Sequence, residues 1–145
     1  MVSTVHLESL DNQKLRFEQL KEISKILNQN PTSLLMGDFN FDSNTNYLNH
    51  PLPLENDSLK TILPYHQDIW SKLKKESGFT FDPKKNELLK GNEEGQMRID
   101  RILIKSKKWI PKTIKLIGDI PFMKDSKKQI FPSDHFGLMT TIEYQ

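Results

Sequence analysis

The sequence contains no cysteine among its 145 residues. A disulfide scaffold, a thiolate zinc site and a cysteine nucleophile are therefore excluded, and the composition is typical of a reducing compartment. Only six residues are glycine, and they form no glycine-rich nucleotide-binding loop. No apolar stretch approaches the ~20 residues of a membrane span, and the N-terminus lacks the basic and apolar regions of a secretory signal. We therefore expect an intracellular protein of the nucleus or cytoplasm that is not secreted.

The chain is also short of hydrophobic residues, which make up 35% of it. Ordinary soluble domains have about 45–50% by a count that includes glycine. This length and composition predict a single domain over residues 1–145 with a thin core.

Basic and acidic residues nearly balance over the whole chain but are unevenly distributed. The sequence has 21 basic and 19 acidic residues, and only four of the basic ones precede residue 58. The lysine-rich later part could face a polyanion such as nucleic acid, or it could be an ordinary solvated surface.

Local patterns predict strands and helices in alternation. Residues 2–7 are β-rich, and a helix is expected from residue 11 or 12 until Asn30-Pro31. Leu34-Leu35-Met36 is typical of a short buried strand. This strand–helix–strand order is the crossover unit of α/β folds. The later segments are expected to be a loop over 42–58, a helix over 65–75, a short extended piece over 79–81, a polar loop over 83–96, and strands over 98–104, 113–117 and 138–144.

Four polar clusters lie where predicted strands end or begin. They are His6-Leu7-Glu8-Ser9, Gly37-Asp38-Phe39-Asn40, Arg98-Ile99-Asp100-Arg101 and Ser133-Asp134-His135. Active sites of α/β sheets gather at strand ends, so this placement points to a functional site. Each cluster alone has an ordinary explanation, as a tight turn, a structural ion pair or a loop.

Together the clusters offer histidine, aspartate and asparagine side chains without a thiolate. Such a set suits a hard cation and a phosphate rather than structural zinc. Phosphoryl chemistry needs a cation on the anionic oxygens, a carboxylate to position and deprotonate water, and donors for the developing charge. The clusters could supply these parts.

In their order, the motifs Gly37-Asp38-x-Asn40, Arg98-x-Asp100-Arg101-Ile102 and Ser133-Asp134-His135 resemble those of the endonuclease/exonuclease/phosphatase superfamily. The resemblance covers nearly the whole chain. It implies an α/β fold that is part of a two-sheet, DNase I-like sandwich, and a hydrolase that cuts phosphoester bonds with Mg²⁺ or Mn²⁺. The first and last clusters are most similar to the 5′-tyrosyl-DNA phosphodiesterases, whose substrate is a DNA end in repair.

Two other functions stay open on the same residues. One is another activity of the superfamily, such as that of an abasic endonuclease, a deadenylase, or a lipid or inositol phosphatase. The other is a non-catalytic remnant that binds nucleic acid through the lysine-rich part of the chain.

The resemblance implies roles residue by residue. Asp38 would position or deprotonate the attacking water, with Asn40 beside it. His135 would donate to a phosphate oxygen, and Asp100 would orient His135. Asp134 would lie near the metal. The residues implied to contact the substrate are His6, Ser9, Arg98, Arg101 and Phe81, although the two arginines could instead steady their own loop and the phenylalanine could pack.

Two departures from the family pattern bear on activity. The first half of the family domain, which carries the glutamate that anchors the metal, has no counterpart here. We therefore expect a partial metal site, an isolated chain that is poorly active and prone to associate, and a need for a missing N-terminal half or a partner chain. Two positions after Asn40, where a basic DNA contact is expected, the sequence has Asp42.

Overall fold

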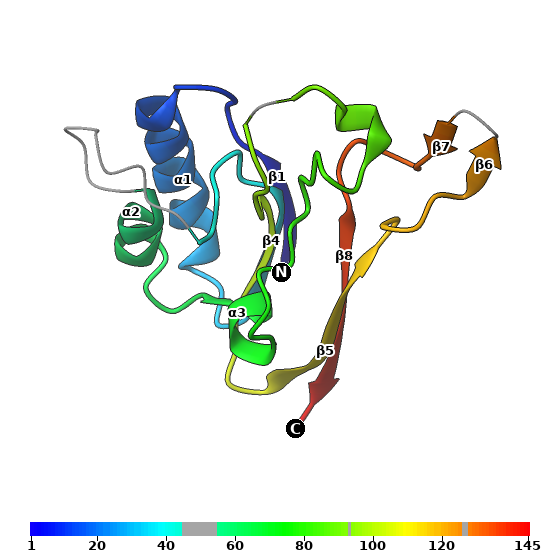
Figure 1. Cartoon of the computed structure of the whole chain (residues 1–145). Helices are drawn as coiled ribbons and strands as arrows, with labels where there is room; N and C mark the ends of the chain where they lie inside the picture. The colour runs from blue at the N-terminus through cyan, green and yellow to red at the C-terminus, as the bar shows by residue number, and fades with distance from the viewer. Residues whose placement is uncertain (45–54, 93, 126–127) are drawn as a thin grey trace.

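A computed structural model describes residues 1–44, 55–92, 94–125 and 128–145. Figure 1 shows a central sheet with two helices on one side and a long pair of strands on the other. Among the described residues, no helix combines the length and the apolar character needed to span a membrane. In chain order the elements are β1 (Val2–His6), α1 (Gln13–Leu27), β2 (Ser33–Asp38), α2 (Glu55–Ile62), β3 (Gln67–Asp68), α3 (Ile69–Leu73), the 3₁₀ helix η1 (Glu87–Leu89), β4 (Asp100–Lys105), β5 (Trp109–Ile117), β6 (Met123–Asp125), β7 (Lys128–Ile130) and β8 (Gly137–Tyr144).

The central sheet begins with the predicted strand–helix–strand unit. Its strand order is β1-β2-β4-β3, and β1 runs parallel to β2 while β4 runs antiparallel to β2. Parallel neighbours need a long crossover connection, and α1 supplies it. The helix buries Leu20 and Leu27 against the sheet, because these apolar residues recur at helical spacing on one side.

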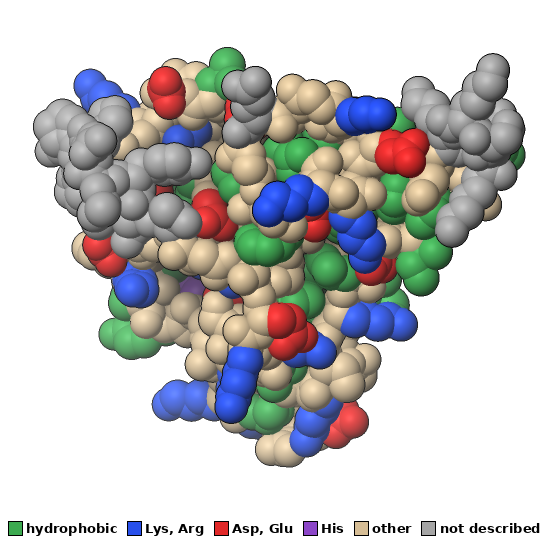
Figure 2. Space-filling model, viewed as in Figure 1, with side chains coloured by type: hydrophobic (Ala, Val, Ile, Leu, Met, Phe, Trp, Pro, Cys, Tyr) green, Lys and Arg blue, Asp and Glu red, His purple; other side chains and the backbone are tan. Residues whose placement is uncertain are grey.

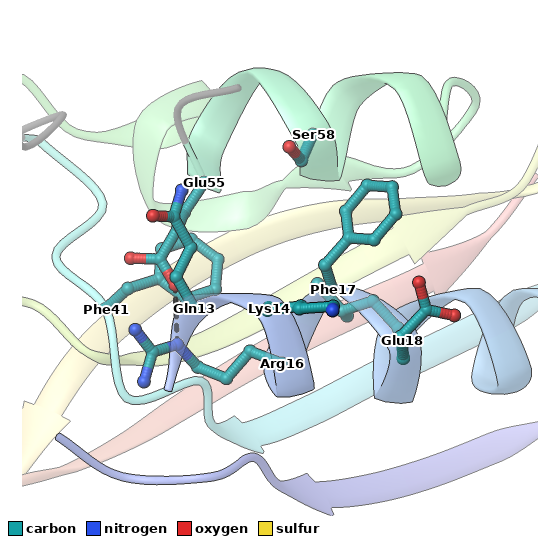
Figure 3. Close-up of a pocket in the computed structure, with 9 residues that line it drawn as sticks. Gln13, Lys14, Arg16, Phe17, Glu18, Phe41, Glu55 and Ser58 are labelled. Carbon is teal, nitrogen blue, oxygen red and sulfur yellow. Dashed lines mark hydrogen bonds and ion pairs between the residues drawn. The ribbon is translucent and has the colours of Figure 1, made fainter. Parts of the chain in front are cut away.

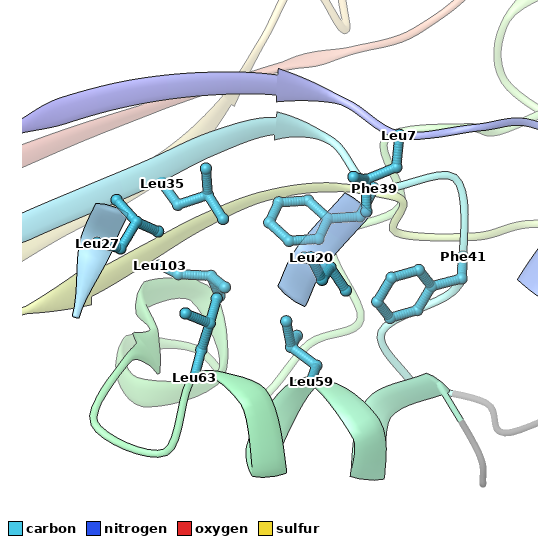
Figure 4. Packing of buried hydrophobic residues seen from close by; sticks show 9 residues of the cluster. All are labelled: Leu7, Leu20, Leu27, Leu35, Phe39, Phe41, Leu59, Leu63 and Leu103. Carbon is cyan, nitrogen blue, oxygen red and sulfur yellow. The ribbon is translucent and has the colours of Figure 1, made fainter. Parts of the chain in front are cut away.

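One hydrophobic cluster fills the space between the helices and the central sheet. Figure 4 shows how the side chains of α1, α2 and the sheet meet there. Leu35 and Leu103 point toward the helices, and Leu59 of α2 and Leu63, the residue after α2, pack against them. Burial of this face fixes the register of the sheet, since a slip by one residue would expose it.

A second cluster fills the space between the two sheets. Leu34, Ile102 and Ile104 point away from the helices and pack with Ile114 of β5 and with Trp70 of α3. β5 pairs with β8 in a two-stranded antiparallel sheet, and β6 pairs with β7 in a small hairpin. The protein is therefore an α/β fold with two packed sheets, as predicted.

Several segments differ from the sequence-based expectation. α2 begins at Glu55, inside the predicted loop over 42–58, because Leu59 and Leu63 gain burial against the sheet; residues 45–54 of that loop lie outside the described part. The helix expected over 65–75 is limited to the five residues of α3, since Gln67 and Asp68 pair with β4 as a strand. The predicted polar loop over 83–96 contains η1, and the β6–β7 hairpin was not predicted.

Charged side chains on the face shown in Figure 2 are mixed in sign. Lysines and arginines are interspersed there with aspartates and glutamates. Of the two explanations for the lysine-rich part of the chain, an ordinary solvated surface fits this face better than a patch of one sign.

Candidate active site

Strand pairing brings three of the four polar clusters to one edge of the central sheet. His6 lies opposite Asp38 at the end of β1 and β2, and Asp38 lies opposite Asp100 at the start of β4. Partners in register point to the same face of a sheet, so the three side chains are neighbours. The fourth cluster reaches the same place through His135, which forms an isolated bridge with Phe81.

A glycine near the end of β2 and an asparagine in the turn after it have unusual backbone angles. Gly37 has φ of 130°, and a Cβ there would lie 2.0 Å from the carbonyl oxygen of Val5. Asn40 has φ of 53°, a left-handed conformation that asparagine tolerates. Its backbone N–H donates to Asp38 Oδ1 at 2.8 Å, and its side-chain Nδ2 donates to the carbonyl oxygen of Leu7 at 2.8 Å. The turn thus fixes the Asp38 carboxylate and ties β2 to the end of β1.

Asp38, Asp100 and His135 form a compact group. His135 Nδ1 lies 3.0 Å from Asp100 Oδ2 and 3.9 Å from Asp38 Oδ2. His6 Nε2 lies 3.5 Å from Asp38 Oδ2 on the other side. The side chain of His6 is 75% exposed, whereas those of Asp38 and His135 are only 16% and 24% exposed. The core of the group is therefore partly shielded, and His6 stands at its solvent side.

The surroundings shift the protonation of two members of this group. Burial raises the pKa of Asp38; the hydrogen bond from the Asn40 backbone opposes this shift, and the nearby charge of Asp100 adds to it. The hydrogen bond to Asp100 raises the pKa of His135 despite its burial, and the charges of Asp100, Asp38 and Asp134 add to that shift. Asp38 is therefore a stronger base than an ordinary aspartate, and His135 holds its proton to higher pH.

The same three residues could hold a divalent cation. One ligand atom from each of Asp38, Asp100 and His135 lies within 4.8 Å of the other two. Two carboxylates suit a hard ion such as Mg²⁺ or Mn²⁺, which can take its other ligands from water or phosphate. Asp134, the residue expected near the metal, is not in this group: its side chain is exposed and accepts a hydrogen bond from Ser133 Oγ at 3.1 Å.

A cleft with a volume of about 430 Å³ opens beside His135. Asn40, Ser9 and Phe81 also line it, so two of the residues expected to contact substrate lie here together. Phe81 is 7% exposed, and its ring lies nearly perpendicular to the His135 ring, at 84° and with 5.6 Å between centroids. Phe81 therefore both packs against His135 and lines the cleft.

Arg98 and Arg101 are not brought to the cleft. Their side chains are 1% and 7% exposed, and both guanidinium groups pair with the carboxylate of Asp68 at 2.9 Å. The backbone N–H of Arg98 also donates to the carboxylate of Asp42, which is buried. The resemblance implied that these arginines contact the substrate, but their burial argues against such a contact. Their burial agrees with the alternative that they steady their own segment. Asp42 likewise serves an internal contact.

Arg16 and Gln19 hold the segment after β1. Arg16 Nη1 donates to the carbonyl oxygens of Glu8 and Leu10, and Gln19 Oε1 accepts from the backbone N–H of Glu8. Figure 3 shows Arg16 paired with Glu55 at one end of a small apolar pocket between α1 and α2. The pocket has a volume of about 170 Å³ and adjoins the cleft.

Two buried polar residues near the site had no signal in the sequence. Thr80 and Asn86 are both fully buried, and their hydrogen bonds reach the segments that carry Asp100 and His135. Thr80 lies in the segment predicted to be a short extended piece, and Asn86 lies in the predicted polar loop. Only their long-range contacts distinguish them from ordinary loop residues.

Comparison with known proteins gives one family match and several similar structures. The profile described as the endonuclease/exonuclease/phosphatase family matches residues 3–135. A search of curated protein sequences finds no significant match. Among solved structures, TDP2 (tyrosyl-DNA phosphodiesterase 2) of D. rerio, complexed with a single-strand DNA product, is 25% identical with a TM-score of 0.75, and the match covers 97% of this chain and 54% of that one.

Two further structures are similar in fold. Truncated TDP2 of Caenorhabditis elegans is 22% identical with a TM-score of 0.66, over 99% of this chain and 55% of that one. A protein of the same family from Leptotrichia buccalis is 25% identical with a TM-score of 0.64, and the match covers 97% of this chain and 47% of that one. The chain thus spans about half the length of these structures. The resemblance predicted from the motifs is confirmed.

Proposed function

Because the chain belongs to the endonuclease/exonuclease/phosphatase family, we propose that it is part of a divalent-cation-dependent phosphodiesterase acting on DNA ends, with 5′-phosphotyrosyl DNA as its substrate. Members of this family are hydrolases. The observation that carries the proposal is the convergence of Asp38, Asp100 and His135 at one sheet edge beside a cleft. The DNA product in the similar structure from D. rerio supports a DNA substrate.

Asp38 and His135 divide the acid–base work in this proposal. Asp38 accepts a proton from the attacking water, and its raised pKa makes it a better base near neutral pH. His135 donates a hydrogen bond to a phosphate oxygen as negative charge develops. Asp100 accepts from His135 Nδ1 and so leaves Nε2 free to face the phosphate. Water adds to phosphorus while the bond to the tyrosine oxygen breaks.

Other side chains at the cleft hold the substrate. His6, next to Asp38, and Ser9, in the cleft, contact the phosphate, with Asn40 beside them. Phe81, which lines the cleft, offers its ring to a base or to the aromatic leaving group. When bound at the carboxylates here, a divalent cation would neutralise charge on the phosphoryl oxygens.

A further segment or a partner chain completes the site in this proposal. In this proposal His135 acts as a donor, and the two remaining carboxylates are fewer ligands than Mg²⁺ takes. β1 is an edge strand of the central sheet, and Val2 on it is 72% exposed. An added strand could therefore pair there and extend the sandwich. We infer that residues 1–145 form the later portion of one catalytic domain, and that turnover by the chain alone is slow.

Hydrolysis of a 5′-phosphotyrosyl oligonucleotide by the purified chain tests this proposal. We expect slow tyrosine release with Mg²⁺ or Mn²⁺, none with a chelator, and a loss of about 100-fold or more in Asp38→Asn. Lys21→Gln, on the exposed side of α1, is the matched control and should keep the rate. Faster turnover of an abasic duplex, polyadenylate or an inositol phosphate would assign another activity of the family. Salt-sensitive DNA binding without metal-dependent turnover would indicate a binding remnant.

A further inference from the structure

We propose that Thr80 and Asn86 are positioning residues that hold Asp100 and His135 at hydrogen-bonding distance. This inference rests on the proposed function, because it assigns these two residues to the placement of the proposed catalytic pair. Asp100 and His135 are 35 residues apart in the sequence and lie on different elements, β4 and the loop before β8. The 80–86 segment joins those elements.

Thr80 connects both elements through one residue. Its Oγ1 accepts from the backbone N–H of Ile99 at 3.1 Å and from that of Asp100 at 3.0 Å. Its carbonyl oxygen accepts from the backbone N–H of Phe136 at 2.7 Å. One contact therefore fixes the backbone of Asp100, and the other fixes the residue that follows His135.

Asn86 fixes the other side of His135. Its Nδ2 donates to the carbonyl oxygens of Ser133 at 2.8 Å and Asp134 at 3.0 Å, the two residues that precede His135. Its Oδ1 accepts from the backbone N–H of Leu88 and so caps η1. The amide side chain is fully buried, and both donor hydrogens of Nδ2 have partners. The His135 loop is thus held from both ends.

These contacts matter because the hydrogen bond between His135 and Asp100 is not enough to fix the two segments relative to each other. His135 and Asp100 share one side-chain hydrogen bond, in a place where both side chains are 21–24% exposed. A misplacement of about 1 Å at reacting groups can cost about 100-fold in rate. Buried hydrogen bonds from Thr80 and Asn86 restrict the two backbones that carry the pair, so the pair is formed before substrate arrives.

The imidazole ¹⁵N signals of His135 at a fixed pH test the inference without any substrate. The chain has four histidines, and His135→Gln identifies the signals of interest. Thr80→Val removes the hydroxyl but keeps the shape, and Asn86→Ala removes the donors. We expect each to move the His135 signals toward those of Asp100→Asn, in which the pair is lost. Thr80→Ser keeps the hydroxyl and should restore the wild-type signals.

Leu59→Ala is the control for general destabilisation. It removes apolar contacts in the hydrophobic cluster between the helices and the central sheet, away from the site. It should therefore lower the unfolding midpoint and leave the His135 signals unchanged. Wild-type His135 signals in folded Thr80→Val or Asn86→Ala would overturn the inference. Failure of both variants to fold would also overturn it, because their role would then be structural. An inactive chain with the expected signals would contradict the proposed function alone.

Discussion

At the scale of single residues, the charge of the site depends on the contact between His135 and Asp100. This hydrogen bond is the main reason that the pKa of His135 is raised above 6.5. The raised pKa stabilises the folded state below pH 6.5, and that contribution is lost as the pH rises through the folded-state pKa. A protonated His135 can donate to a phosphate oxygen, so the same contact serves folding and the proposed chemistry.

Asp100→Asn should lower the pKa of His135, because it removes the acceptor charge 3.0 Å from Nδ1. The pH dependence of stability just above pH 6.5 should become flatter in the same variant. An NMR titration of the His135 ring and urea unfolding at several pH values measure the two effects. Asp57→Asn, on the exposed side of α2, is the control. An unchanged His135 pKa in Asp100→Asn would refute this explanation.

Asp68 neutralises two buried arginines, and its loss should be costly. Burial alone would raise the pKa of this carboxyl, but the charges of Arg101 and Arg98 lower it. Asp68→Asn removes the carboxylate that pairs with both buried guanidinium groups, and we expect the free energy of unfolding to fall by about 3–5 kcal/mol. Urea denaturation measures it. Asp57→Asn breaks only a pair of exposed side chains 3.8 Å apart and should change stability by at most about 0.5 kcal/mol. Equal losses of stability in the two variants would contradict the claim that Asp68 neutralises the two buried arginines.

Sequence motifs single out Asp38, Asp100 and His135, and the structure brings these three side chains together. The residues that support them carry no such motif. Arg98 and Arg101 carry the same kind of motif signal, yet their partner Asp68 lies 30 or more residues away. Burial of a guanidinium group is set by such long-range contacts, which no local pattern records.

At the scale of elements, β1, α1 and β2 could be predicted from local patterns: β-rich residues for β1, a helical apolar period for α1 and a short apolar run for β2. α2 could not, since Asn56, Asp57 and Ser58 in its first turns are residues that favour caps and turns. Its helix is stabilised instead by packing of Leu59 and Leu63 on the sheet. The short strands β3, β6 and β7 have only two or three residues each. A segment of that length has no periodic signal.

The β1–β2 pairing depends on a glycine at position 37. A side chain at this position would collide with the carbonyl oxygen of Val5 across the ladder. Gly37→Ala should therefore destabilise the protein by about 1–3 kcal/mol more than Gly91→Ala, where a Cβ meets no atom within 4 Å and only the positive φ is strained. Thermal and urea unfolding of the two variants give the comparison. Equal losses would show that the close approach of β1 contributes nothing.

At the scale of the whole molecule, two packed sheets bring residues from four distant segments to one edge. β1, β2 and β4 place His6, Asp38 and Asp100 there by register, and the loop before β8 adds His135. His66 lies at the other end of β2, bonded to Ser33 Oγ at 2.8 Å. Five residue steps along a strand, about 17 Å, separate Ser33 from Asp38. His66 therefore lies far from the site and can serve as an internal control when a ligand is bound there.

Binding of Mn²⁺, followed by paramagnetic broadening of the histidine ring signals, tests the central claim most directly. It needs neither turnover nor a known substrate. A cation at Asp38 and Asp100 should broaden the signals of His135 and His6 and spare those of His66, and Mg²⁺ in excess should reverse the effect. Asp38→Asn should abolish it. Equal broadening of all three histidines, or unchanged broadening of His135 in Asp38→Asn, would contradict the account.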